Sequence, residues 1–409
     1  MLYARWHECH YVLQDDGAVL TWCAGESGDV FIPAKVDGYA VVGIVDAFSG
    51  DSTLTSIAMP NTITTIGPYA FCNCRNLTNI NISASVTSIG SDAFLGCTNL
   101  TSVLIPACVT NIGYSAFEDC SSLSGLVIPD GIADIGDRVF LRCRNLTAVD
   151  IPNSVTNIGS YAFCACDRLM SVTMPNGLMC IGDRAFCSCG ELTGALAVPD
   201  SVTSIGELAF YGCTNLDSVT IGNGVTNIGD NAFGGCSGLT SVTISNCVAN
   251  IGQYAFAGCS GLISVMISNC VANIGYSAFN GCLGLSSVII GSGVTNIDDS
   301  AFYGCSRLAN MTIPDSVTSI GNNAFSGCSG LTRVSIPDSV TRIGSSSFSG
   351  CSGLTSVTIP DSVKSIGPFA FKDCSNLTHA YVPSALRSSM SSYYGVFEGC
   401  PADLVITYY

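Results

Sequence analysis

Apolar positions recur along this chain with a fixed period. A phenylalanine appears fifteen times at steps of 23 residues, with one step of 24, at positions 48, 71, 94, 117, 140, 163, 186, 210, 233, 256, 279, 302, 325, 348 and 371. The residue six positions after each of these is Leu, and the residue three positions after is Cys in fourteen of the fifteen. A period of this length is typical of solenoids, in which neighbouring repeats bury one another's apolar positions. The pattern therefore predicts one repeat domain instead of the two or three globular domains that 409 residues would otherwise suggest.

Each repeat reads L-x-x-V-x-I-P-x-x-V-x-x-I-G-x-x-A-F-x-x-C-x-x. Residues 100–105 (L-T-S-V-L-I) alternate with period two at their end, which predicts a short strand with Val and Ile pointing inward. Pro106 ends this strand because proline has no N–H for a further ladder bond. A second extended piece covers residues 109–112, and residues 116–120 (A-F-E-D-C) predict about one helical turn.

A glycine follows the second Ile in thirteen of fourteen repeats, as at Gly113. The exception is Asp298, and aspartate also tolerates a positive φ. We therefore expect this column to adopt the left-handed backbone conformation.

The fold expected from these patterns is a mostly β repeat solenoid of about fifteen 23-residue units, each with one short parallel strand, a turn and a short helical turn. Residues 1–45 do not carry the repeat and predict a β-hairpin cap, with strands at 10–13 and 18–23. Residues 46–382 form the solenoid, and residues 383–409 a variant repeat with a Ser-rich, helical insert and a closing strand. The 24-residue step near 193–195 predicts a bulge.

The motif resembles the BspA-like, or Treponema pallidum-type, leucine-rich repeat, as in residues 331–351 (L-T-R-V-S-I-P-D-S-V-T-R-I-G-S-S-S-F-S-G-C). The resemblance extends from about Ala47 to Cys400. It implies a curved, right-handed, leucine-rich-repeat-like solenoid with one strand per repeat on the concave side. Better-known members are surface or secreted proteins of bacteria and protists that are regarded as adhesins. The family offers no catalytic or cofactor-binding residue to carry over.

Charge and composition reduce the number of functions that are compatible with the sequence. Only 11% of residues are charged, and 14 basic against 30 acidic residues give a net charge of −16, which argues against a nucleic-acid partner. No apolar run reaches the ~18 residues of a membrane-spanning helix. The chain holds three histidines, His7, His10 and His379, near opposite ends of the sequence. We therefore expect no enzyme activity, no cofactor and a monomeric chain.

The 24 cysteines fall into groups. Those in the column three residues after Phe, from Cys97 to Cys374, are predicted to be reduced, buried and to act as small hydrophobic side chains. The column directly after Phe varies in residue type, so Cys72, Cys164 and Cys187 are the thiols expected to be accessible. Two questions stay open: whether Cys9 pairs with Cys23, and whether the carboxylates of the Asp315, Asp338 and Asp361 column only form turns or bridge a Ca²⁺ ion.

The outward strand positions form a field of Ser and Thr on the expected concave face, in which a protein or glycoprotein partner would bind. Apolar or aromatic residues interrupt this field and are the candidate partner-binding residues: Leu104 with Val127, Met266 with Ile289, and His379 with Tyr381. Such residues are common anchors of protein interfaces.

An alternative site is a basic group on the convex or lateral side, which is either solvated or binds an anionic ligand. It comprises Arg138, Arg142, Arg144, Arg168 and Arg184. The resemblance implies a cell-surface or secreted adhesion scaffold. The alternatives are a cytoplasmic spacer, favoured by free thiols and by the lack of a signal peptide in this chain, or an accessory domain of a larger enzyme.

Overall fold

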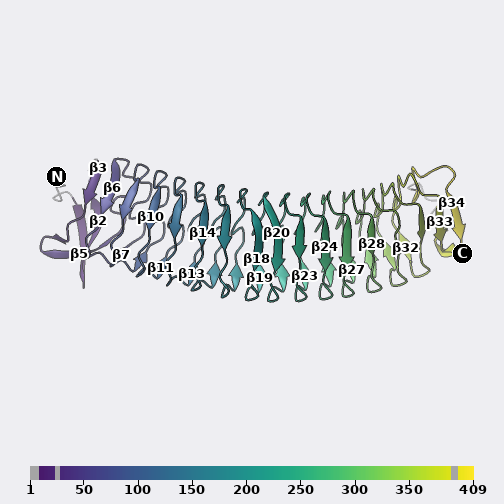
Figure 1. Cartoon of the computed structure of the whole chain (residues 1–409), viewed down its shortest axis with the longest axis horizontal. Coiled ribbons are helices and arrows are strands. Elements are labelled where there is room, and N and C mark those ends of the chain that lie inside the picture. Colours follow the sequence, from purple (N-terminus) through teal and green to yellow (C-terminus); the bar gives the residue numbers. More distant parts are fainter. Residues whose placement is uncertain (1–8, 24–27, 388–394) are drawn as a thin grey trace. The chain divides into compact units, whose positions relative to one another are not determined.

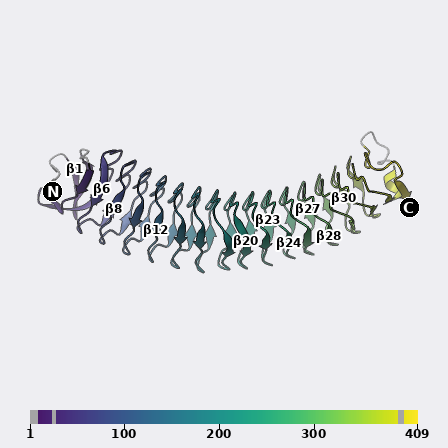
Figure 2. The same ribbon diagram turned by 45° about the horizontal axis from the view of Figure 1, so that its top comes forward.

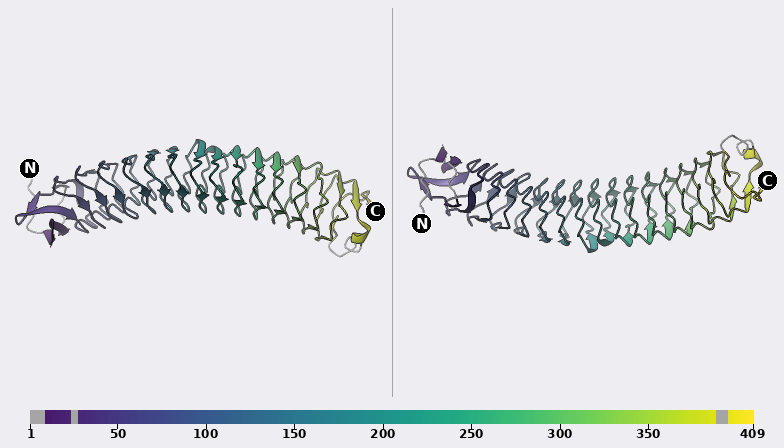
Figure 3. Two further views of the ribbon diagram at one scale, coloured as in Figure 1. Left: turned by 90° about the horizontal axis from the view of Figure 1, so that it is seen from below. Right: turned by 90° about the horizontal axis from the view of Figure 1, so that it is seen from above.

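The computed structural model describes residues 9–23, 28–387 and 395–409 of the chain. It comprises two compact units, Met1–Thr193 and Gly194–Tyr409. Within each unit, coils of the chain follow one another in sequence order, as four viewing directions show (Figure 1, Figure 2 and Figure 3). Almost all regular structure is parallel strand, so the predicted β-solenoid is confirmed.

The first unit contains two kinds of sheet. The strands of the L-x-x-V-x-I segments are β3 (Gly28–Phe31), β6 (Leu54–Ala58), β8 (Asn79–Asn81), β10 (Ser102–Leu104) and β12 (Gly125–Val127), followed by the separate pair β14 (Ala148–Asp150) and β16 (Ser171–Thr173). The second kind of sheet begins with the six-residue strand β5 (Tyr39–Ile44). It continues with the two-residue strands β7 (Thr65–Ile66), β9 (Ser88–Ile89) and β11 (Asn111–Ile112), then β13 (Asp134–Ile135), β15 (Asn157–Ile158) and β17 (Cys180–Ile181). We call the outward surface of the L-x-x-V-x-I strands the strand face.

The second unit repeats this plan. Its strand face is built from β18 (Gly194–Val198), β20 (Leu216–Ile221), β22 (Ser241–Thr243), β24 (Ser264–Ile267), β26 (Ser287–Ile290) and β28 (Asn310–Thr312), then β31 (Ser356–Thr358), β33 (His379–Val382) and β34 (Val405–Tyr408). Its shorter strands are β19 (Ser204–Ile205), β21 (Asn227–Ile228), β23 (Asn250–Ile251), β25 (Asn273–Ile274), β27 (Asn296–Ile297), β29 (Ser319–Ile320), β30 (Arg342–Ile343) and β32 (Ser365–Ile366). From β20 to β28, register partners are 23 residues apart, as in Ser241↔Ser264, so equivalent positions of successive repeats lie side by side.

The predicted N-terminal hairpin is present. Strand β1 (Cys9–Gln14) pairs antiparallel with β2 (Gly17–Cys23), and a disulfide joins Cys9 and Cys23, which settles the open question about this pair. Strand β2 also pairs with β5, while β4 (Lys35–Val36) forms an antiparallel ladder with β5.

The C-terminal segment ends in a strand, as predicted. Strand β34 pairs in parallel with β33. Of the Ser-rich insert, the structure describes a 3₁₀ helix at Ser384–Leu386, and the rest of the expected helix, residues 388–394, lies outside the described residues. The bulge expected from the 24-residue step is the register shift between Gly194 and Ala195 in the pairing of β18 with β20.

The Phe column forms the centre of the core in each unit. Twelve of its members are among the largest fully buried side chains, including Phe325. Phe325 stacks on Phe302 and Phe348, with ring centroids 5.4 and 5.3 Å apart and interplanar angles of 3° and 14°. This separation indicates offset stacking, the arrangement that aromatic rings prefer over a direct sandwich.

The cysteine column is buried and forms no disulfide, as predicted. Each thiol also makes a specific hydrogen bond that the sequence analysis did not anticipate. Cys282 Sγ donates to the carbonyl oxygen of Phe256, one repeat earlier, at 3.2 Å, and the same bond recurs through both units. The cysteine therefore acts as a hydrogen-bond donor between coils as well as a small apolar side chain.

The prediction for the glycine column was wrong. Gly113 does not have a positive φ; instead, a Cβ there would lie 2.4 Å from the Ser91 nitrogen of the preceding coil. The left-handed conformation occurs two residues later, at Ser115 (φ 50°), Arg138 (φ 56°) and their equivalents. Glycine is needed after the second Ile because two backbones approach closely, while non-glycine residues occupy the left-handed turn.

Candidate functional site

The first unit places one predicted apolar pair on its strand face. Leu104 of β10 and Val127 of β12 are register partners in neighbouring strands, and 72% and 63% of their surfaces are exposed. Their inward neighbours Val103 and Leu126 are buried. The alternation of the strand thus turns Leu104 and Val127 to the outside.

The second predicted pair lies on the strand face of the second unit. Met266 of β24 and Ile289 of β26 are register partners and are 58% and 63% exposed. Thr243 precedes Met266 and Thr312 follows Ile289 in the same row across the strands. The two side chains therefore form a continuous apolar patch bordered by hydroxyl groups, which we call the Met266–Ile289 patch.

A depression of about 470 Å³ adjoins this patch, and sequence analysis missed it. Ile289 is one of its lining residues, together with Met311, Thr312, Arg333 and Ser335. It exists because the strand face is interrupted: in the described residues, no ladder joins the 331–336 segment to β28 or to β31. The repeat directly before this interruption has Met311 at the position where other repeats have an inward Val. Met311 is half-buried and is the register partner of Val288.

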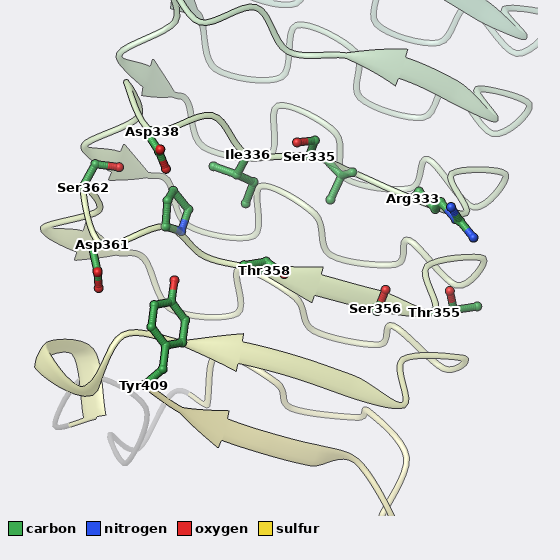
Figure 4. A pocket seen from close by; sticks show the side chains of 12 residues that line it. Arg333, Ser335, Ile336, Asp338, Thr355, Ser356, Thr358, Asp361, Ser362 and Tyr409 are labelled. Atoms are coloured by element: carbon green, nitrogen blue, oxygen red, sulfur yellow. The ribbon is translucent and has the colours of Figure 1, made fainter.

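A second depression of about 1010 Å³ lies beside the same segment. Figure 4 shows Arg333 at one end and Asp338, Asp361 and Tyr409 at the other. The Tyr409 hydroxyl donates to the Ile359 carbonyl oxygen at 2.6 Å. Burial raises the pKa of Tyr409 above its usual value, with smaller contributions from the carboxylates of Asp361 and Asp338. Tyr409 is therefore a neutral donor at the acidic end of this depression.

Among the described residues, no group of three or more His, Cys, Asp or Glu side chains is placed to hold a metal ion. Asp338 and Asp361 of the aspartate column line the larger depression, whereas Asp315 does not. In the described part of the chain, the aspartate column therefore does not form a set of ligands for Ca²⁺.

The structure places His379 and Tyr381 on the outward side of β33, both exposed. Ser356 and Thr358 are their register partners on β31, and Val405 and Thr407 those on β34. His379 Nδ1 lies 3.0 Å from Thr378 Oγ1. The two residues lie on the strand face of the last coils and do not line the two depressions.

Four of the five arginines of the alternative site contact neighbouring repeats. Arg142 Nη1 lies 3.4 Å from Asp119 Oδ2, and Arg144 Nη1 lies 3.8 Å from Asp167 Oδ2. The guanidinium groups of Arg138 and Arg184 both lie over the Tyr161 ring, at 5.4 Å from its centroid. For the exposed Arg168, the described residues show no ion pair or ring contact. The carboxylate partners of Arg142 and Arg144 reduce the positive charge that this group offers to an anionic ligand.

The comparison with known proteins decides the family. The model of the BspA type leucine rich repeat region (6 copies) matches residues 45–169, 134–196, 181–309 and 295–405. The chain belongs to this family.

Solved structures support the same fold for this BspA-type chain. It is 29% identical to a leucine-rich repeat protein from Bacteroides ovatus, with a TM-score of 0.78 and 98% of each chain covered. A leucine-rich repeat protein from Eubacterium ventriosum is 23% identical, with a TM-score of 0.50 and coverage of 84% of this chain and 92% of that one. The pneumococcal vaccine antigen PcpA is 17% identical, with a TM-score of 0.54 and coverage of 98% and 97%. No curated protein matches the chain.

Within residues 9–23, 28–387 and 395–409, the BspA-type chain has no apolar helix of membrane-spanning length.

The accessible thiols of the BspA-type chain differ partly from those predicted. Cys164 and Cys187 are half-exposed, as expected, but Cys72 is buried, and its sulfur accepts a hydrogen bond from Asn73 Nδ2. The exposed thiols are Cys108, Cys247 and Cys270. They occupy the turn after the first strand of their repeats, a position whose turn chemistry is the signal that could have identified them.

We expect native protein with its Cys9–Cys23 disulfide intact to titrate in two stages. The three exposed thiols and Cys187, whose pKa is lowered by its neighbours, react first with a thiol reagent, and the partly exposed Cys164, Cys180 and Cys400 follow. The remaining free thiols react only after denaturation, because burial raises the pKa of ladder thiols such as Cys236 and Cys305 to about 12. The measurement is the time course of reagent consumption with and without denaturant. Equal consumption in both conditions, or disulfides within the ladder, contradicts this prediction.

Proposed function

We propose that this chain is a non-enzymatic binding scaffold that holds a protein or glycoprotein partner on its strand face. The proposed centre is the Met266–Ile289 patch of the second unit. The observation that carries the proposal is that two large apolar side chains, 58% and 63% exposed, are register partners on adjacent strands in a field of hydroxyl groups. The Leu104–Val127 pair of the first unit is a second contact area of the same kind.

Rigidity supports this choice of surface. Ladder hydrogen bonds hold β24 against β22 on one side and β26 on the other, so Met266 is fixed in position before any partner arrives. Side chains that are ordered in advance lose less entropy on docking. The neighbouring Ser and Thr hydroxyls offer donors and acceptors that are less costly to desolvate than charges, which suits an interface with few anchors.

Charge suggests what the partner presents. Arg333 lines the depression beside the patch, and the described residues show no ion pair that involves it. Residues 185–306 contain no Lys or Arg, so Arg333 is a rare positive group near this patch in a strongly acidic chain. We therefore propose that the partner contributes an apolar side chain to the patch and a carboxylate to Arg333. An Arg side chain binds a carboxylate through paired hydrogen bonds.

For the biological setting we propose cell-surface or secreted adhesion. Its support is the resemblance of the repeat to those of BspA-like surface proteins. The competing proposal is a cytoplasmic spacer, favoured by the 22 free thiols. Protease treatment of intact cells of the source organism, followed by detection of the chain, separates these settings: a surface protein is digested and an internal spacer is protected.

The binding test uses a partner identified by pull-down with the full chain and affinities measured by titration. We expect Met266→Ser combined with Ile289→Ser to weaken binding by about tenfold or more, because interface anchors of this kind contribute on the order of 1–2 kcal/mol. Arg333→Ser is expected to weaken binding further and to reduce its dependence on salt.

The matched control replaces Leu283 and Tyr303 with Ser, since these side chains are 53% and 45% exposed and lie in turns between the strands. This control is expected to bind normally. The proposal fails if the control loses as much affinity as the patch variant. It also fails if only a variant with Arg138, Arg142 and Arg168 changed to Ser loses affinity, and high salt abolishes binding of the parent chain.

A further inference from the structure

Two half-exposed thiols meet on the side of the first unit, away from its strand face. Cys164 and Cys187 occupy the column directly after Phe in successive repeats. We propose that Cys164 and Cys187 form a thiol–disulfide exchange site whose substrate is a low-molecular-weight disulfide of the glutathione type. Oxidation of this site would link two successive coils covalently.

Backbone geometry brings the two residues together. The Ala165 N–H donates to the Cys187 carbonyl oxygen at 2.7 Å, and the rings of Phe163 and Phe186 stack with centroids 5.3 Å apart. Successive coils are thus about 5 Å apart here, inside the ~4.4–6.8 Å range of Cα separations that a disulfide spans. The side chains of Cys164 and Cys187 interact with each other.

The orientation of this pair differs from that of the cysteine column next to it. Cys166 Sγ donates to the Phe140 carbonyl oxygen at 3.3 Å, and Cys189 Sγ donates to that of Phe163 at 3.2 Å. Cys166 and Cys189 are therefore buried and bound to backbone, whereas Cys164 and Cys187 interact with each other and are half-exposed. In the column directly after Phe, the repeat before Cys164 holds Leu141. Cys187 is therefore the one thiol beside Cys164 in this column of the first unit.

The surroundings assign different roles to the two thiols. The Ser188 hydroxyl lies 3.6 Å from the Cys187 sulfur and can donate to its thiolate. The interaction with Cys164, this hydroxyl and the Arg184 guanidinium all lower the pKa of Cys187. Cys164 has no such hydroxyl beside it in the sequence, so we assign Cys187 as the attacking thiolate and Cys164 as the thiol that resolves the intermediate.

The small disulfide RSSR is the only oxidant that this exchange needs. The Cys187 thiolate attacks one sulfur of RSSR, the S–S bond of RSSR breaks, and RS⁻ leaves and takes up a proton. Cys164 then loses its proton and attacks the Cys187 sulfur of the mixed disulfide, which releases the second RSH. Two electrons pass from the two thiols to RSSR, and the products are the Cys164–Cys187 disulfide and two RSH.

The test treats the full chain with glutathione disulfide and maps the cysteines by mass spectrometry. We expect the parent chain to gain a Cys164–Cys187 disulfide with no retained glutathione. Cys164→Ser is expected to keep a stable glutathione adduct at Cys187, and Cys187→Ser to lose the reaction at this site. Cys108, an exposed thiol without a thiol partner in its turn, is the internal control and forms at most a mixed disulfide.

A second measurement does not depend on oxidation. Phenylarsine oxide bridges two adjacent thiols with loss of water, so the parent chain is expected to bind one equivalent at this site, and each single variant is expected to lose that binding. Unchanged far-UV circular dichroism shows that the variants fold. The proposal is overturned if the parent chain and Cys164→Ser give the same mixed disulfide at Cys187, or if the single variants bind the arsenical as the parent does.

Discussion

Phe325→Ala is expected to destabilise the second unit by about 3–5 kcal/mol. Phe325 has no exposed surface and stacks on Phe302 and Phe348, so its removal leaves a cavity between two rings that cannot close up without breaking the spacing of the coils. The loss concentrates in the neighbouring coils because each coil of a solenoid contacts mainly the coils beside it. Urea denaturation followed by circular dichroism measures the loss, and hydrogen exchange shows which coils open.

The matched control is Phe31→Ala, since 66% of the Phe31 side chain is exposed at the outward side of β3. A surface substitution of this kind is expected to change stability by less than about 0.5 kcal/mol. Equal losses in the two variants would show that the Phe column is not the core of the stack.

Gly275→Ala is expected to lower the free energy of unfolding by about 3 kcal/mol. This value is at the upper end of the range for an extra methyl group inserted into a well-packed core. A Cβ at this position would lie 2.6 Å from the Ile251 carbonyl oxygen and 2.9 Å from the Gly252 carbonyl carbon. Both contacts are backbone atoms of the preceding coil, which cannot move aside as a flexible side chain could. Denaturant midpoints of the variant and the parent chain give the difference.

The contrasting variant is Gly281→Asn. Gly281 has a φ of +71°, but its Cβ position has no neighbour closer than 3.8 Å, and Asn73 holds the equivalent position in another repeat with a φ of 58°. Asparagine tolerates this conformation, so we expect a loss below about 1 kcal/mol. If Gly281→Asn proved more harmful than Gly275→Ala, backbone conformation and not close approach would be the reason for the glycine column.

Much of the fold could be predicted because the same pattern is repeated fifteen times in one phase. The inward positions, the hairpin, the closing strand and the bulge near Gly194 all followed from spacing and turn residues. The left-handed column could not be found in this way, since Ser115, Arg138, Tyr161 and Leu208 share that conformation but no residue type. A glycine column has two physical explanations, positive φ and close approach, and the sequence does not distinguish them.

The candidate site could be predicted only in part. The 23-residue spacing placed Met266 beside Ile289 and Leu104 beside Val127, because residues one period apart become register partners. The depressions beside Arg333 were not predictable, since residues 331–336 carry the full strand consensus and yet lack a ladder to either neighbour in the described structure. The ion pair between Arg142 and Asp119 also spans one period, and the same spacing rule could have revealed it.

The proposal that a partner docks on the Met266–Ile289 patch is tested most directly by hydroxyl-radical footprinting of the saturated complex. Met266 is 58% exposed, and Met170 and Met179 are exposed to 51% and 54% outside the strand face, so three residues of the same chemistry can be compared in one experiment. We predict that bound partner slows the oxidation of Met266 several-fold and leaves Met170 and Met179 unchanged. Oxidation of Met266 at its free rate in a complex that protects other residues would contradict the account.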